Sequence, residues 1–179
     1  MKRITITLLL SVMCIICLHA QNSNGRGIFA EINAGYGTVK YHKSTEGYFA
    51  ITPSLGYQFN EHWAIGGKVS FETAAEKNIA VGVYGQYYFN TTERLKFFTE
   101  AQLTEFLQEA DGGDPTFTEV GLSLGVSYAI HSNLNLIFRY GYIGFSGNPH
   151  RDEGFAFVKK NFLIDGNLRR LQVGLRYCF

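Results

Sequence analysis

Hydrophobic positions alternate with small or polar positions along most of the chain after Gly27. Ile28, Ile32 and Tyr36 share one phase of this pattern, for example, and Glu31 has the opposite phase. A period of two is typical of β-strands, because successive side chains point to opposite faces of a sheet. Eight segments with this pattern are predicted to be strands: 28–37, 49–59, 63–72, 79–89, 95–106, 119–128, 134–143 and 170–179.

The lengths of the segments and of their connections favour a membrane barrel. Each segment has about ten residues, which exceeds the usual strand of soluble sheets and suffices for a tilted strand to cross a bilayer. Short connections at 60–62, 90–94 and 131–133 alternate with longer ones at 39–47, 73–78, 107–115 and 146–167. The sequence therefore predicts an all-β fold, an eight-stranded antiparallel transmembrane up-and-down β-barrel. Both termini are expected on the short-turn side, in the periplasm.

Pro53 is an irregularity in the second predicted strand. Proline lacks the backbone N–H that a central strand donates, and a closed barrel has no edge at which this would not matter. A β-bulge at Pro53 is the expected accommodation.

The first 20 residues are predicted to be a cleaved secretory signal peptide, which leaves residues 21–179 as the barrel domain. Lys2 and Arg3 precede an apolar stretch that ends near Leu18, and cleavage is expected after Ala20. The remaining chain holds one cysteine, Cys178, so no internal disulfide is expected. No second apolar run reaches the roughly 18 residues of a membrane-spanning helix.

Composition narrows the function classes. Only 17% of residues are charged and 15% are aromatic, which argues against a disordered chain or a coiled coil. A formal net charge of +1 lacks the basic excess of a nucleic-acid-binding surface, so no nucleic-acid partner is expected. We assign the aromatic residues to the lipid-facing side and its interfacial belt. The 20 glycines are expected to keep the opposite face small enough to close a narrow barrel.

A few charged residues occupy this small-residue face. Five of them lie at similar depths from the short-turn end: Glu31, Lys68, Glu100, Arg139 and Arg176. Buried charges must be paired and hydrogen-bonded, and the mixture of signs meets this requirement. We therefore predict a charge network across the lumen, with Glu72, Glu119 and Arg170 extending it toward the outer end. A soluble β-sandwich, in which these charges would face solvent, remains an alternative.

Taken together, these features resemble the small outer-membrane β-barrel proteins of Gram-negative bacteria, the eight-stranded porin-like and surface-protein barrels. The resemblance rests on the signal peptide, on aromatic and glycine-rich strands such as EINAGYG at 31–37, and on the ending LQVGLRYCF at 171–179. It implies location in the outer membrane, contact with outer-membrane lipid and lipopolysaccharide, and recognition by the barrel-assembly machinery through Tyr177 and Phe179. It is specific for architecture and does not by itself assign a function.

Candidates for catalysis and metal binding are weak. His42 and Ser44 resemble the His-x-Ser pair of outer-membrane lipid A deacylases, but no acidic residue is marked as the partner that would orient the histidine. Glu109, Asp111 and Asp114 do not have the spacing of an EF-hand calcium loop. No metal site, no cofactor and no enzymatic activity are predicted.

The connection at 146–167 is the strongest candidate for a surface contact, because loops of this length in compact folds are often functional. Its aromatic and basic residues would suit lipopolysaccharide phosphates or an unknown surface ligand: Arg151, Phe155, Phe157, Lys159 and Lys160. The alternative is a hairpin over 155–164 that extends the last two strands.

The sequence favours a non-enzymatic outer-membrane scaffold that presents extracellular loops for surface contacts and has a lumen closed by buried charges. A narrow channel for small solutes is the alternative, and a lipid A-modifying hydrolase is the third hypothesis.

Overall fold

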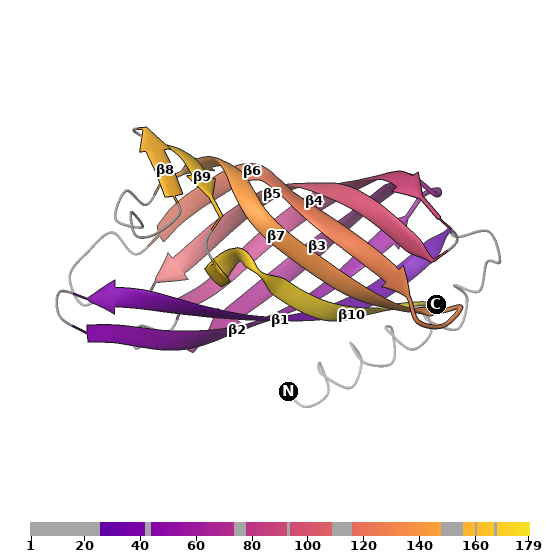
Figure 1. The fold of residues 1–179 in the computed structure, drawn as a ribbon, viewed down its shortest axis with the longest axis horizontal. Coiled ribbons are helices and arrows are strands. Elements are labelled where there is room, and N and C mark those ends of the chain that lie inside the picture. The colour runs from indigo at the N-terminus through magenta and orange to yellow at the C-terminus, as the bar shows by residue number, and fades with distance from the viewer. Residues whose placement is uncertain are drawn as a thin grey trace, which may run out of the picture.

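The strands of the protein wrap into one elongated barrel in the computed structural model (Figure 1). The structure describes residues 26–41, 44–73, 78–92, 94–108, 116–147, 156–159, 161–166 and 168–179. The elements are β1 (Gly27–Tyr41), β2 (Ser44–Gln58), β3 (Trp63–Glu72), β4 (Asn78–Thr91), β5 (Leu95–Gln108), β6 (Thr116–Ala129), β7 (Leu134–Ser146), β8 (Ala156–Lys159), β9 (Phe162–Asp165), the 3-10 helix η1 (Leu168–Arg170) and β10 (Gln172–Cys178).

Backbone pairing closes the barrel. Each strand from β1 to β6 pairs antiparallel with the next, and β10 pairs with both β7 and β1. Glu31 lies opposite Arg176 at one of these seams, and Arg139 lies opposite Gln172 at the other. The predicted eight-stranded antiparallel barrel is therefore confirmed. No helix among the described residues is long and apolar enough to cross a membrane.

Two strands, β9 and β10, together take the place of the eighth strand in the barrel wall. Along β7, Leu134 to Arg139 pair with β10, whereas Tyr142 to Phe145 pair with β9. Gly141 lies between these two stretches with a φ of +74°, a conformation that glycine adopts without steric cost. The prediction of one strand over 170–179 is wrong at its start, because Arg170 belongs to η1. The hairpin expected as the alternative near 155–164 is present as β8 and β9.

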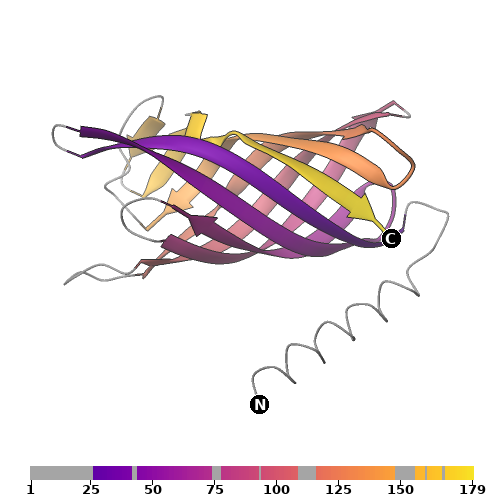
Figure 2. The same ribbon diagram turned by 90° about the horizontal axis from the view of Figure 1, so that it is seen from below.

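The two ends of the barrel differ in their connections, and Figure 2 shows that the C-terminus lies at one of them. We call the end that holds the β2–β3, β4–β5 and β6–β7 connections the turn end, and the opposite end the loop end. Gly27 pairs with Gln58, so the described N-terminal residues also lie at the turn end. The long loop expected at 39–47 is wrong, because β1 and β2 remain paired up to Tyr41 and Ser44.

Side-chain burial in the barrel is the reverse of that in a soluble sandwich. Ile32 and Leu124 point outward and are 54% and 63% exposed, whereas Glu31 and Glu100 are buried. The polar and small face of each strand therefore lines the interior, which removes the sandwich alternative. The expectation that aromatic residues lie on the outer face is wrong for six of the described ones, which are buried inside: Phe29, Tyr84, Tyr88, Phe98, Phe106 and Tyr142.

The expected bulge at Pro53 is also wrong. The register between β2 and β3 is the same on both sides of Pro53, from Ile51 opposite Phe71 to Ser54 opposite Lys68. Between these two pairs, the side-chain hydroxyls of Thr52 and Ser70 share a 2.9 Å hydrogen bond that bridges the two strands. The register shifts lie elsewhere, at Phe89–Thr91 in β4 and at Leu122–Leu124 in β6.

Candidate functional site

The five charged residues singled out in the sequence meet inside the barrel, and we call them the charge network. They form a chain of ion pairs in the order Lys68, Glu100, Arg139, Glu31 and Arg176, each from a different strand. The two carboxylate side chains are at most 1% exposed. A line of alternating cations and anions thus crosses the lumen from β3 to β10.

Arg139 is the central member of the charge network. Its Nε lies 2.7 Å from Glu100 Oε2 and its Nη1 lies 2.6 Å from Glu31 Oε1, so one guanidinium joins both carboxylates. The other oxygen of Glu31 accepts Arg176 Nε at 2.7 Å. Lys68 Nζ donates to Glu100 Oε1 at 3.1 Å. Pairing of this kind, with well-formed hydrogen bonds, is what allows ions to be buried.

Neutral polar side chains complete the hydrogen bonding of the charge network. Asn33 donates to Glu31 and accepts from Arg139, and Gln86 donates to Glu100 and accepts from Arg176. Tyr88 accepts from Arg176, and Gln102 accepts from Lys68. Sequence reasoning missed these roles, although all four residues lie in the inward phase of their strands.

An aromatic cluster fills the lumen between the charge network and the turn end. It consists of Phe29, Ala64, Tyr84, Tyr88, Phe98 and Ile137. The Arg176 guanidinium lies 4.0 Å from the centre of the Phe29 ring, and that of Arg139 lies 5.5 Å from the centre of the Phe98 ring. Cations stack favourably on aromatic faces, so the cluster and the charge network form one packed unit.

A second group of charges lies toward the loop end. Arg170 donates from Nε to Asp165 Oδ2 at 2.7 Å and from both Nη atoms to Glu119 at 3.1 and 3.2 Å. Ser146 also donates to Glu119 at 3.2 Å, and Arg170 lies 4.6 Å from the centre of the Tyr142 ring. The sequence predicts Arg170 and Glu119 as an outward extension of the charge network, and in the structure they pair with each other toward the loop end. Asp165 was not singled out, because it follows an irregular part of the last connection.

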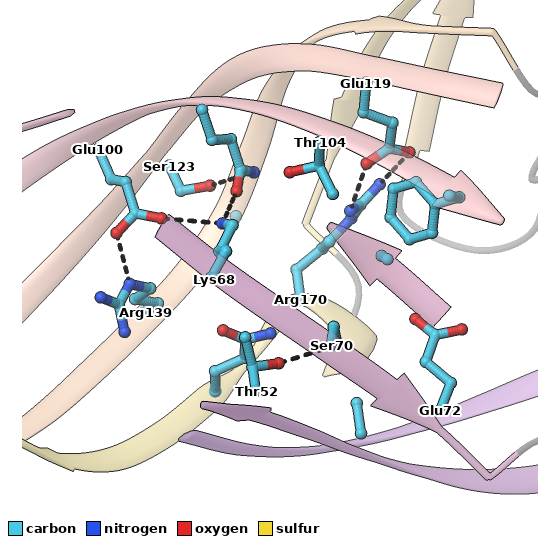
Figure 3. A pocket seen from close by; sticks show the side chains of 16 residues that line it. Thr52, Lys68, Ser70, Glu72, Glu100, Thr104, Glu119, Ser123, Arg139 and Arg170 are labelled. Atoms are coloured by element: carbon cyan, nitrogen blue, oxygen red, sulfur yellow. Dashed lines mark hydrogen bonds and ion pairs between the residues drawn. The ribbon is translucent and has the colours of Figure 1, made fainter. Parts of the chain in front are cut away.

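A polar cavity of about 90 Å³ separates this second group from the charge network (Figure 3). Lys68, Glu100 and Arg139 line its side toward the turn end, whereas Glu119 and Arg170 line its side toward the loop end. Between them lie hydroxyl and amide side chains: Thr52, Ser70, Gln102, Thr104, Ser123 and Gln172. From the turn end, the lumen thus contains the aromatic cluster, the charge network, the polar cavity and the Arg170 group.

The remaining candidates are at the surface or outside the described residues. Tyr177 points outward, is 47% exposed, and packs edge-on against Phe179 with ring centres 5.1 Å apart. Arg151, Phe155 and Lys160 lie outside the described residues, as do the side chains of Phe157 and Lys159, whose backbone forms part of β8.

The hydrolase and calcium candidates are not placed by the structure. His42, Glu109, Asp111 and Asp114 lie outside the described residues, as does the side chain of Ser44. Within the part of the chain that is described, no group of three or more His, Cys, Asp and Glu side chains is arranged to hold a metal ion.

Comparison with protein families identifies the barrel. The profile of a family described as outer membrane protein beta-barrel domain matches residues 6–179. The chain belongs to this family. The family places the protein in the outer membrane of a Gram-negative bacterium, which confirms the resemblance seen in the sequence. Among curated proteins, none matches the chain significantly.

Solved structures of outer-membrane proteins share the fold. Neisserial surface protein A is 22% identical, with a TM-score of 0.55 over 85% of this chain and 97% of its own. The N-terminal β-barrel domain of Pseudomonas aeruginosa OprF is 15% identical, with a TM-score of 0.56 over 84% and 97%. Ail, the attachment invasion locus protein of Yersinia pestis, is 11% identical, with a TM-score of 0.50 over 87% and 99%. At these identities the likeness concerns the fold alone.

Proposed function

We propose that the protein is a non-enzymatic scaffold whose lumen is closed and whose loop end makes the specific contacts. The observation that carries this proposal is the packed unit of aromatic cluster and charge network, in which side chains of β1, β3, β5, β7 and β10 join across the lumen. Eight strands enclose an interior only wide enough for side chains to fill. Conductance in planar bilayers tests closure, and reproducible single-channel steps would favour the narrow channel instead.

The proposal includes an orientation, with the turn end in the periplasm and the loop end outside the cell. Its support is the difference between the connections, because outer-membrane barrels have short periplasmic turns and longer extracellular loops. An epitope tag between Gly112 and Gly113 should be bound by antibody on intact cells. A matched tag next to Glu61, in the β2–β3 turn, should become accessible only after permeabilisation. The opposite labelling would overturn the orientation.

We further propose that the loop end contacts lipopolysaccharide or another surface ligand through Arg151, Phe155, Phe157, Lys159 and Lys160. The support is the sequence of residues 151–160, which mixes cationic and aromatic residues, since cations pair with phosphate groups. Replacing Arg151, Lys159 and Lys160 together by alanine should weaken binding to lipopolysaccharide vesicles. The same number of lysine and arginine replacements at the turn end, including Arg94 and Lys96, should leave binding unchanged.

Outer-membrane lipid and the barrel-assembly machinery are the other proposed partners. The exposed apolar face suits lipid, and Tyr177 and Phe179 supply the terminal aromatic signal. Phe179→Ala should lower the amount of folded barrel in the outer membrane, whereas Phe59→Ala, at an aromatic residue of the same end, should not. Lipid A with an unchanged acyl pattern in cells with and without the protein is the result expected of a barrel that does not modify lipid.

A further inference from the structure

The outer wall of the barrel carries one carboxylate among apolar side chains. Glu105 has the outward phase of β5, where its neighbours Leu103 and Leu107 are 47% and 46% exposed. On β4 it pairs with Val81, which also faces outward. Among the side chains that the structure describes, Glu105 is the only charged one that is exposed within a strand. It therefore lies on the surface that we assign to lipid.

Other polar side chains on the outer wall are satisfied by the wall itself. The Thr99 hydroxyl donates to the carbonyl of Ser123 at 3.3 Å, and the Tyr140 hydroxyl donates to the carbonyl of Gly166. This solution is not open to Glu105, because an ionised carboxylate only accepts hydrogen bonds. The backbone around it is already paired with β4 and β6. Glu105 has no hydrogen-bond or ion-pair partner within the described part of the chain.

The membrane determines which partner this carboxylate requires. An unpaired charge that faces hydrocarbon costs free energy, and the cost is smaller near the interface than at the bilayer centre. Glu105 lies on the loop-end half of β5, which faces the outer leaflet in the proposed orientation. The lipopolysaccharide of that leaflet carries phosphate groups, and like charges repel unless a cation lies between them. Hard divalent cations such as Ca²⁺ and Mg²⁺ take oxygen ligands of this kind.

We propose that Glu105 is the protein ligand of a divalent cation that bridges the barrel wall to a lipid phosphate. Thr118 lies directly opposite Glu105 on β6, is exposed in the same outward phase, and offers a hydroxyl oxygen. Opposite residues of antiparallel strands have Cβ atoms about 4.5–5.5 Å apart, so both side chains reach one ion. Phosphate and water oxygens supply the remaining ligands. This inference goes beyond the proposed function, in which cationic residues of the loop end contact the lipid, and it rests only on the proposed orientation.

Urea unfolding of the full chain in vesicles of phosphatidylcholine and lipid A tests the proposal, with Ca²⁺ as the probe. Ca²⁺ should raise the urea midpoint of the unaltered protein above its value in EDTA, because an ion that binds only the folded wall stabilises it. Glu105→Gln keeps the size of the side chain but removes its charge, and should lose this shift. Thr118→Val should reduce it. The matched control is Glu61→Gln, at an exposed carboxylate of the turn end, which should keep the whole shift.

Vesicles of phosphatidylcholine alone test the role of the lipid phosphate, because this lipid carries its own positive charge beside the phosphate. Without lipid A, Ca²⁺ should leave the midpoint of the unaltered protein unchanged. A full shift in Glu105→Gln would overturn the proposal, as would a shift without lipid A as large as with it. Lipid A lies in both leaflets of these vesicles, so the result does not depend on the proposed orientation, which the epitope tags test separately.

A second measurement observes the carboxylate directly and does not depend on unfolding. In protein with isotope-labelled glutamate carboxyl carbons, the NMR spectrum of Glu105→Gln identifies the Glu105 resonance by its absence. In the unaltered protein, Ca²⁺ should move this resonance when lipid A is present, and should leave the Glu61 resonance in place. An unmoved Glu105 resonance in lipid A vesicles would overturn the proposal, as would equal movement of both resonances.

Discussion

Glu31 and Glu119 are both buried carboxylates of the lumen, but the two halves of the barrel hold them differently. Glu31 accepts from Arg139 and Arg176, and the rings of the aromatic cluster pack directly against these guanidinium groups. Glu119 pairs with Arg170, which borders the polar cavity on one side and is partly exposed. In the closed lumen that we propose, closure comes from packing ion pairs against large apolar side chains rather than from ion pairs alone.

The net charge of the charge network also distinguishes the turn-end half from the loop-end half. The charge network has three cations and two carboxylates, a net charge of +1. Neutralising a carboxylate raises this to +2, whereas removing a cation lowers it to zero. The carboxylates are therefore the members whose loss the packed half tolerates least.

The largest expected effect is the loss of Glu31. Glu31→Gln should lower the free energy of unfolding by about 3–5 kcal/mol, because Arg139 and Arg176 lose a shared charge partner while buried. Glu119→Gln should cost less, about 1–3 kcal/mol, because Arg170 keeps Asp165 at 2.7 Å. Urea unfolding in lipid vesicles measures both values. Equal losses would show that the two halves do not differ in the way described.

A smaller effect on stability is expected from alanine substitutions at two glycines, one on the inner face and one on the outer face of the barrel wall. A Cβ at Gly125 would overlap the ring of Phe98 in the aromatic cluster, whereas a Cβ at Gly85 would meet nothing within 4 Å. Gly125→Ala should therefore destabilise the barrel by about 1–3 kcal/mol through overpacking. Gly85→Ala should change stability by at most about 0.5 kcal/mol, as surface substitutions do. The same urea titration compares them, and a tolerated Gly125→Ala would contradict tight packing of the turn-end half.

The smallest effect is expected in the polar cavity. Thr52→Val removes the 2.9 Å hydrogen bond to Ser70 but leaves Ser70 beside the cavity, so the loss should be about 0.5–1.5 kcal/mol. Val69→Ala, next to Ser70 on β3 and outside the cavity lining, provides a control for the general effect of shortening a side chain in this strand. A loss above that of Glu119→Gln would mean that the cavity is packed more tightly than its lining indicates.

The alternation of residues predicted the strands, because burial on one face of a strand forces a period of two whichever face is apolar, and the lengths of the strands and of their connections then favoured a barrel. It also predicted the five members of the charge network, since charges on the inward phase at equal depth can reach one another across eight strands. Both depend on strand periodicity, the most regular signal in the chain.

The parts that sequence reasoning missed depend on contacts between distant residues. Tyr88 and Phe98 are as aromatic as the outward-facing residues, and only the phase of their strands distinguishes them. Asp165 meets Arg170 because η1 interrupts the last strand, which no periodic pattern reveals. The register continues unchanged past Pro53, and two neighbouring hydroxyls bridge the strands there, a local contact that propensity does not predict.

Ion conductance of the unaltered protein in planar lipid bilayers is the most direct test of whether the aromatic cluster and the charge network close the turn-end half of the lumen. If they do, the unaltered protein should give no reproducible single-channel steps above those of protein-free bilayers. Clear and reproducible steps from correctly folded barrel would contradict this closure, because ions would then pass between Arg139 and the rings that are described as closing the lumen.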